Sequence, residues 1–250
     1  MASPPGHTAS VDYGLDGPPI VRNFALIGAG LVLAGGLLYL LFASTQPALA
    51  TILLIVGILA GLPSLLSAVV MVRSSRLGKL KQRERLMDLV NLRGDETVLD
   101  VGCGRGLLLI AAAKRLPRGK AVGIDLWQAE DLSGNRPEAT LANAEAEGVA
   151  DRVEVKTGDM QQMPFPDGTF DVAVASMAIH NIPTAEGRVK AIREISRVLK
   201  PGGRVALQDF MATGEYAETL RDLGWQNVER SGLSLALWPP VRIVTGRKSN

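Results

Sequence analysis

The sequence predicts an α/β protein with a doubly wound, mostly parallel seven-stranded sheet, preceded by two transmembrane helices. Two long uncharged stretches lie near the N-terminus, and short strand patterns alternate with helical patterns after residue 94. A glycine-rich loop also follows the first of these strands. Regular alternation of strands and helices is typical of a parallel sheet that helices cover on both faces.

Composition excludes several classes of protein. The chain has 250 residues, 47% of them apolar, and a net charge of +2. Much of the basic surplus lies in one short run, so we expect no nucleic-acid partner. Cys103 is the single cysteine, which excludes an intrachain disulfide. His7 and His180 are the only histidines, and with one cysteine they make no metal-ligand pattern, so we expect no metal.

The first part of the chain predicts a tail and a membrane hairpin. Residues 1–19 mix prolines and glycines with polar residues, as disordered tails do. Residues 24–42 and 48–72 carry no charge, and about 20 helical residues span a hydrocarbon core of about 30 Å. A signal peptide has a shorter apolar run and a basic start, and a second span follows at once here. We therefore predict a two-helix transmembrane hairpin over 20–72 rather than a signal peptide or a buried core.

Charge predicts the orientation of the hairpin. Residues 73–93 are expected to form a basic juxtamembrane linker and helix, because six Lys or Arg and one Glu lie between 73 and 85. The positive-inside rule places this segment in the cytoplasm. The protein is thus predicted to cross the cell membrane twice, with its N-terminus and its large domain in the cytoplasm. The "GILAG" at 57–61 fits either close helix packing or ordinary small-residue content.

The domain over 94–250 is predicted element by element. Helices are expected over 107–116, from Pro137 to before Gly148, from a Thr184 cap to residue 199, and over 215–223. The apolar run at 170–177 is typical of a strand buried on both faces. The seven expected strands are 97–102, 120–126, 152–159, 170–177, 204–210, 226–231 and 235–247.

A glycine loop and an acidic residue predict a nucleoside site. The stretch "VLDVGCGRG" at 98–106 ends a buried strand in glycines, so a ligand can approach the main chain. Asp125 ends the next strand, where a carboxylate can accept hydrogen bonds from two ribose hydroxyls. A glycine turn that serves only tight packing is the alternative. A dinucleotide-binding loop fits less well, because the third glycine comes one residue early.

Four motifs resemble those of class I S-adenosylmethionine-dependent methyltransferases, most closely the "type 11" branch that acts on small molecules. They are "VLDVGCGRG", "GIDL", "TGDMQQMPFPDGTFDVAVASMAIHNI" and "LKPGGRVAL", in order over residues 85–250. The resemblance implies a Rossmann-like methyltransferase fold and S-adenosyl-L-methionine as cofactor.

The resemblance also implies site residues. Asp100 would lie by the amino group of the cofactor, and Asp125 would hold the ribose hydroxyls. Leu126 or Trp127 would lie against the adenine, and Asp159 with Met160 would meet its amino edge. The remaining residues are Gly102, Cys103, Gly104 and Gly106 beneath the methionine part, and Ser176 and Met177 on the methyl-transfer side.

Several roles stay open at this point. His180 is either a general base or a structural residue that holds its loop. Cys103 is expected to be a small loop residue rather than a nucleophile. The loop 126–136 is either a flap over the cofactor or a surface loop around Trp127.

The hairpin favours an acceptor dissolved in the bilayer, such as a prenylated quinone or a phospholipid headgroup. Anchoring alone, with a soluble small-molecule acceptor, is equally open, whereas arsenite is disfavoured because only Cys103 is present. The rival function is a membrane-anchored protein that binds the cofactor without catalysis, as a sensor or scaffold.

Overall fold

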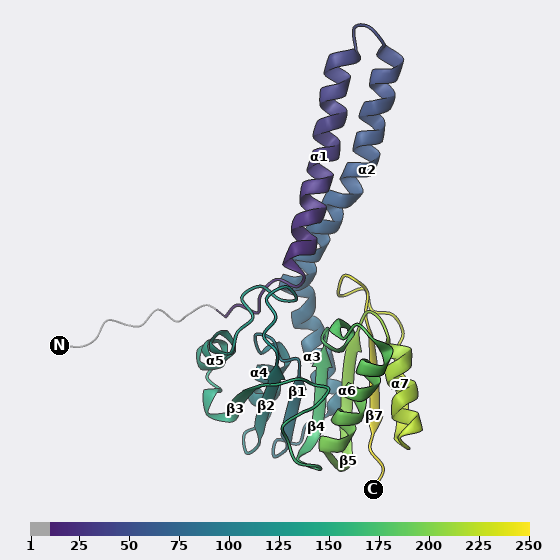
Figure 1. The fold of residues 1–250 in the computed structure, drawn as a ribbon. Helices are drawn as coiled ribbons and strands as arrows, with labels where there is room; N and C mark the ends of the chain where they lie inside the picture. Colours follow the sequence, from purple (N-terminus) through teal and green to yellow (C-terminus); the bar gives the residue numbers. More distant parts are fainter. Residues whose placement is uncertain (1–10) are drawn as a thin grey trace, which may run out of the picture.

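Two long helices project from an α/β domain in the computed structural model, which describes residues 11–250 (Figure 1). Helix α1 spans Pro18–Phe42 and α2 spans Pro47–Arg73. Helix α2 continues through a π-helical turn, η1 (Ser74–Gly78), into α3 (Lys79–Val90), which packs on the domain. The hairpin is thus continuous with an element of the domain core.

A seven-stranded mixed sheet forms the centre of the domain, in the order β3-β2-β1-β4-β5-β7-β6. Strands β1 to β5 are parallel, β7 is antiparallel to β5, and β6 is antiparallel to β7. The mostly parallel sheet is therefore confirmed, with an antiparallel part at one edge. The strands are β1 (Thr97–Val101), β2 (Lys120–Asp125), β3 (Val153–Thr157), β4 (Phe170–Ser176), β5 (Leu199–Asp209), β6 (Gln226–Arg230) and β7 (Arg242–Arg247).

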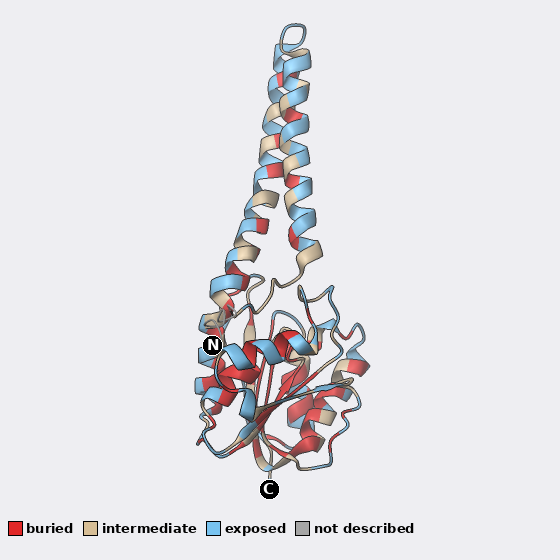
Figure 2. Ribbon diagram, turned by 90° about the vertical axis from the view of Figure 1, so that its left-hand side faces the viewer, coloured by how far each residue is buried: buried red, intermediate tan, exposed pale blue. Residues whose placement is uncertain are grey.

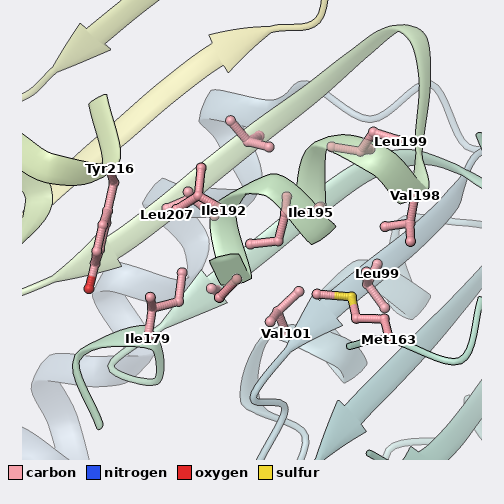
Figure 3. Packing of buried hydrophobic residues seen from close by; sticks show 14 of the residues in the cluster. Leu99, Val101, Met163, Ile179, Ile192, Ile195, Val198, Leu199, Leu207 and Tyr216 are labelled. Atoms are coloured by element: carbon pink, nitrogen blue, oxygen red, sulfur yellow. The ribbon is translucent and has the colours of Figure 1, made fainter. Parts of the chain in front are cut away.

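Helices cover both faces of the sheet. Helices α4 (Leu107–Lys114) and α5 (Pro137–Ala146) lie with α3 on one face, where Leu86, Val98 and Leu109 share a core. Helices α6 (Ala185–Val198) and α7 (Thr213–Asp222) lie on the other, over the core that Figure 3 shows. Short 3-10 turns occur at η2 (Ala150–Arg152) and η3 (Ile179–Asn181). As predicted, the Thr184 side chain caps α6 by accepting from the Gly187 amide.

The last predicted strand is too long. Only Arg242–Arg247 forms β7, whereas residues 235–241 lie in the loop before it. This loop contains Pro239 and Pro240, which have no amide hydrogen to donate to a ladder. Strand β5 is longer than predicted at its start, since it begins at Leu199 rather than at residue 204.

The N-terminal tail differs from its prediction over the part that the structure describes. Residues 1–10 lie outside the described part of the chain. Residues 11–17 are ordered against the domain, because their polar main-chain groups find partners there. The amide of Leu15 donates to the Ser133 hydroxyl at 2.7 Å, and the amide of Gly17 donates to the carbonyl of Asp131 at 2.9 Å. A disordered tail over all of 1–19 is therefore wrong for 11–17, and also for residues 18 and 19, which begin α1.

Small residues lie between α1 and α2, and large apolar residues point outward. A Cβ added to Gly57 would lie 2.7 Å from the Leu31 carbonyl oxygen, and one added to Gly61 would lie 2.7 Å from that of Gly28. Leu33 and Leu40, by contrast, are more than 70% exposed. Most of the hairpin surface is exposed (Figure 2). Both helices are long and apolar enough to cross a membrane, a test of length and composition alone.

Candidate cofactor and acceptor site

Three of the five non-glycine residues with positive φ among residues 11–250 lie at one edge of the sheet. Trp127, Met177 and Ala212 have φ angles of 62°, 55° and 57°, in the left-handed region that side chains other than glycine rarely adopt. They follow β2, β4 and β5, so all three lie at the carboxyl ends of parallel strands. Strained non-glycine residues cluster at functional sites, and ligands of open α/β sheets bind at this edge. The edge is therefore the candidate site.

The glycine loop is shaped by close approaches of the main chain. Gly102, Gly104 and Gly106 all have positive φ angles. A Cβ on Gly102 would lie 2.3 Å from that of Ala178, so this glycine lets the end of β4 approach the loop. Gly104 differs, because a Cβ there would meet only Cδ2 of Leu132 within 4 Å. The space in front of Gly104 is thus bounded by the tip of one flexible side chain.

Asp125 is fixed at the mouth of this loop. Its Oδ2 accepts from the Gly104 amide at 2.8 Å, and its Oδ1 accepts from the Trp127 amide at 2.6 Å and from Nδ2 of Asn135 at 3.2 Å. These donors orient the carboxylate and leave Oδ2 able to accept again. Asn135 was not predicted from the sequence. The feature that could have pointed to Asn135 is its position in the loop 126–136, ten residues after Asp125.

Asp100 is a buried carboxyl beneath the loop. Its Oδ2 accepts from the Leu109 amide at 2.8 Å, and the residue is 2% exposed. Burial raises its pKa to about 8, helped by the nearby charge of Asp125 and opposed by the Leu109 hydrogen bond. A cationic group beside Asp100 would favour its charged form. The site therefore has a carboxyl suited to an ammonium ligand.

Cys103 is buried in the same loop. Burial and the charges of Asp100 and Asp125 raise the pKa of its thiol well above the usual range. Its amide donates to the Ile124 carbonyl at 3.2 Å. A thiol that stays protonated is a poor nucleophile, which supports the prediction that Cys103 is a loop residue.

The predicted adenine residues lie after β2. Leu126 is 50% exposed. Trp127 is half-buried, and its ring nitrogen donates to the Thr157 hydroxyl at 2.8 Å, which ties the ring to the end of β3. Both residues directly follow Asp125 in the chain, and their contact with an adenine stays a prediction.

Asp159 and Met160 occupy the turn after β3. The Asp159 carboxylate accepts from the Gln161 amide at 2.8 Å and so closes its own turn. The Met160 methyl group lies 3.5 Å from where a Cβ on Gly102 would be. Met160 is therefore beside the glycine loop, whereas the Asp159 carboxylate is occupied locally in this structure.

A second polar group lies across the edge, at the ends of β4 and β5. Nδ1 of His180 lies 2.8 Å from Oδ1 of the buried Asp209, although that oxygen is off the direction of the ring N–H. Oδ2 of Asp209 accepts from the His180 amide and the Tyr216 hydroxyl, both at 3.2 Å. The Phe210 ring packs edge-on to His180 at 4.6 Å. Asp209 thus positions the only histidine in the described part of the chain.

Ser176 and Gln208 face each other in the register of these strands. Nε2 of Gln208 donates to the Ser176 hydroxyl at 2.9 Å, and the Met177 amide donates to the Gln208 carbonyl at 3.0 Å. Oε1 of Gln208 is buried and has no hydrogen-bond partner among residues 11–250. An unsatisfied buried acceptor beside Ser176 and Met177 could receive a donor from a ligand.

The loop 126–136 lies against the glycine loop and Asp125, to which Nδ2 of Asn135 donates. Burial raises the pKa of Asp131, the His180 charge lowers it, and the Asp125 charge raises it. The Leu132 side chain packs against Gly104. This arrangement favours the flap over the plain surface loop. A nucleoside donor fits the glycine cradle, Asp125 and Asp100, provided that the Leu132 side chain turns away.

The sequence missed Asp209, Gln208 and Asn135. Asp209 ends a parallel strand, as Asp125 does, and Asp100 is the last residue but one of β1, so this shared position was an available signal. Among residues 11–250, no group of three or more His, Cys, Asp or Glu is placed to hold a metal ion.

Comparison with known proteins shows what the domain resembles. Residues 98–203 match a family model described as a methyltransferase domain. The ubiquinone/menaquinone biosynthesis C-methyltransferase UbiE of Roseobacter denitrificans is 34% identical over 128 residues, which are 51% of this chain and 48% of that protein. The nocamycin O-methyltransferase of Saccharothrix syringae is 41% identical over 124 residues, 49% of this chain and 41% of that protein. The chain thus spans about half or less of these relatives.

Solved structures share the fold. The [4+2]-cyclase SpnF has a TM-score of 0.57 at 21% identity, covering 68% of this chain and 81% of its own. The geranyl diphosphate C-methyltransferase of Streptomyces coelicolor, solved with S-adenosyl-L-homocysteine, has a TM-score of 0.54 at 18% identity, covering 67% and 78%. Residues 98–203 of this chain are therefore similar to a methyltransferase domain, and these comparisons support S-adenosylmethionine as the methyl donor.

Proposed function

We propose that this chain is a membrane-anchored methyltransferase that moves a methyl group from S-adenosylmethionine to a small-molecule or lipid-like acceptor. One observation carries the proposal: the glycine loop with Asp100 and Asp125 lies at the same sheet edge as the His180–Asp209 pair. A donor site and a proton acceptor thus lie at one edge of the same sheet.

The residues that would bind the methyl donor, here called the donor half, are proposed from the contacts already described. Asp125 would accept from the ribose hydroxyls, Asp100 would pair with the amino group, and the bare face of Gly104 would take the methionine part. Leu126 and Trp127 would flank the adenine. When bound, the cofactor supplies an activated methyl group on sulfur. The protein then has to align the acceptor and exclude water.

The residues around His180 and Asp209, here called the acceptor half, would remove a proton from the acceptor. His180 would take a proton from an acceptor hydroxyl or acidic carbon at its free ring nitrogen, Nε2. Asp209 would hold Nδ1 and stabilise the positive charge that forms on the ring. Catalytic hydrogen bonds of an unliganded site often tighten only with substrate bound, which suits the off-axis contact between Nδ1 and Asp209. Ser176 and Gln208 would bind polar atoms of the acceptor.

The membrane part of the proposal rests on how the hairpin packs. A helix pair in the core of a soluble protein buries its large apolar residues, whereas this pair buries Gly28, Gly35 and Gly57 and exposes most of its leucines. Small residues between helices and large ones outside are typical of packing in lipid. The basic segment after α2 supports a cytoplasmic domain. UbiE is named for ubiquinone and menaquinone biosynthesis, which is consistent with an apolar acceptor.

Binding and turnover test the proposal separately. Calorimetry of the detergent-solubilised chain should show S-adenosylmethionine binding that Asp125→Ala weakens at least tenfold. Asp151→Ala is the matched control, since its side chain is 76% exposed on η2. Membrane extract with labelled cofactor should then yield a labelled small molecule or lipid. Absence of binding contradicts the cofactor site, and binding without any labelled product favours the sensor.

A further inference from the structure

The loop between β6 and β7, residues 231–241, exposes apolar side chains at the base of the hairpin. Leu235 is 78% exposed, Leu233 is 55% exposed and Trp238 is 46% exposed. The loop contains no charged residue. It lies at the end of the domain from which α1 and α2 project (Figure 1). An exposed apolar patch of this kind marks an interaction surface.

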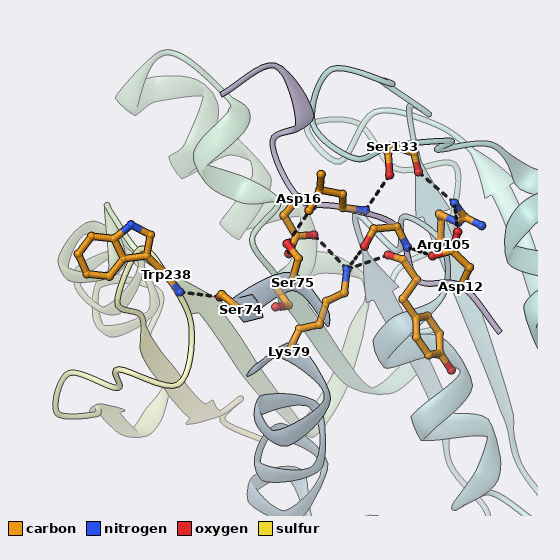
Figure 4. Close-up of polar contacts among 12 residues, drawn as sticks. Asp12, Asp16, Ser74, Ser75, Lys79, Arg105, Ser133 and Trp238 are labelled. Carbon is orange, nitrogen blue, oxygen red and sulfur yellow. Dashed lines mark hydrogen bonds and ion pairs between the residues drawn. The ribbon is translucent and has the colours of Figure 1, made fainter. Parts of the chain in front are cut away.

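This loop is attached to the helix that continues the hairpin. The Trp238 amide donates to the Ser74 hydroxyl at 2.7 Å, and Nε2 of Gln82 donates to the Ser234 hydroxyl (Figure 4 shows the first contact). Gly78 allows the approach, because a Cβ there would overlap the Ala236 carbonyl oxygen. The loop therefore keeps a fixed depth relative to the hairpin.

That depth matches a membrane interface. Val69 is 62% exposed on the apolar part of α2, and Ser74 follows five residues later, about 8 Å along the helix axis. The polar layer on each side of a hydrocarbon core of about 30 Å is about 5–8 Å thick. Tryptophan is enriched in this layer. A bilayer around α2 would thus bring its headgroups to Trp238.

Exposed arginines lie at the same depth along the hairpin helices. Arg73 and Arg76 are exposed just after the apolar part of α2, and Arg22 is exposed just before that of α1. Within residues 11–250, none of the three lies within ion-pair distance of a carboxylate. Lys79 of the same basic run is instead buried and donates to the carbonyls of Tyr13 and Gly14. The three free arginines are complementary to anionic headgroups.

His180 and the residues that follow β5 lie at this end of the domain as well. Phe210 and Met211 are 38% and 45% exposed directly after β5, and Phe210 contacts His180. The apolar rim of the site and the apolar loop thus belong to one end of the domain.

We propose that loop 231–241 and the Phe210–Met211 rim are seated in the interfacial layer of an anionic phospholipid bilayer, so that an apolar acceptor reaches His180 directly from the lipid. This inference rests on the proposed membrane anchor and names the route by which the acceptor enters.

A fluorescent probe at Leu235 tests whether loop 231–241 lies in the interfacial layer. Cys103 is buried, so Leu235→Cys can be labelled selectively with an environment-sensitive dye in the full chain. Leu223→Cys is the matched control, because Leu223 is 40% exposed after α7, at the opposite end of the domain. The protein is reconstituted in vesicles of phosphatidylcholine and phosphatidylglycerol. We expect a blue shift at 235, and quenching by lipids with nitroxides near the headgroup several-fold stronger than at 223.

The outcomes separate the two proposals. Failure of the chain to float with vesicles contradicts the anchor itself. Flotation with equal quenching at both positions contradicts the interfacial position of loop 231–241 but not the membrane anchor. A blue shift at 235 that persists in detergent and is not quenched by lipid means contact with a second copy of the chain, which also overturns it. Replacing phosphatidylglycerol by phosphatidylcholine should weaken the quenching at 235, because the arginines lose their partners.

Discussion

A single buried carboxylate, Asp209, changes what His180 can do. An isolated histidine at a strand end can equally hold a loop, but Asp209 is 1% exposed and contacts both Nδ1 and the amide of His180. Removing the base should therefore slow the chemical step without changing cofactor binding. We expect His180→Gln to lower kcat about 10²–10⁴-fold, and Asp209→Asn to lower it less and to shift the pH profile. Turnover and calorimetry on the same samples measure both.

Equal turnover in the wild type and in His180→Gln would show that the acceptor needs no proton removed, as for a nitrogen with a free lone pair. A loss of cofactor binding in Asp209→Asn would mean that Asp209 is a folding residue. Tyr216→Phe is the milder control for the Asp209 contacts, because it keeps the ring and removes only the hydroxyl that donates to Asp209. Burial and Asp209 both raise the pKa of that hydroxyl.

Asp100 gives a second prediction at this scale, on stability. Its folded pKa of about 8 lies above the ordinary value of 3.8, so the folded chain keeps this proton while the unfolded chain releases it. The stability that this provides is complete below about pH 4 and is lost as pH rises to about 8. Between pH 5.5 and 8 the Tm of the unliganded wild type should fall by roughly 5–10 °C more than that of Asp100→Asn. Scanning calorimetry at several pH values measures this.

The same substitution should weaken S-adenosylmethionine binding, because the ammonium loses its carboxylate. Parallel Tm curves for the two proteins would contradict a raised pKa at Asp100. A cofactor affinity unchanged in Asp100→Asn would contradict its proposed partner.

The elements show what local pattern can and cannot predict. Strand and helix periodicity, the Pro137 start and the Thr184 cap placed most elements correctly, because these signals are local. The 11–17 segment was missed because its partners, Ser133 and Asn143, are more than 100 residues away. Asp209 was missed for a similar reason, since only the pairing of β4 with β5 brings it to His180. The positions of Asp125 and Gly104 followed from one motif and its spacing.

The hairpin gives a prediction at the element scale. Gly57 faces the Leu31 carbonyl oxygen and Gly35, whereas Gly36 meets nothing within 4 Å of an added Cβ. Gly57→Leu should therefore separate α1 from α2 at a cost of about 1–3 kcal/mol, and Gly36→Leu should leave the pair intact. Unfolding by sodium dodecyl sulfate, followed by circular dichroism, measures the difference. Equal effects of the two substitutions would show that the helices do not pack through this seam.

In the whole molecule, polar contacts connect the hairpin to the sheet edge that holds the candidate site. Lys79 is buried on α3 and donates to the main chain of the 11–17 segment and to Asp16. That segment contacts Ser133 of the loop 126–136 and, through Asp12, Arg105 of the glycine loop (Figure 4). The base of the hairpin and the mouth of the site are thus parts of one contact network, so the orientation of the hairpin sets that of the site.

That orientation is open to a direct measurement. The short turn between α1 and α2 contains Ser44, which is exposed, and Lys81 is exposed on α3 beside the domain. Cys103 is buried, so engineered cysteines can be labelled over a low background. With the domain in the cytoplasm, a membrane-impermeant maleimide added to intact cells should label Ser44→Cys and leave Lys81→Cys unlabelled until the cells are opened. The reverse pattern would place the site outside the cytoplasm, away from its cofactor. Labelling of both in intact cells would show that the helices do not span the membrane.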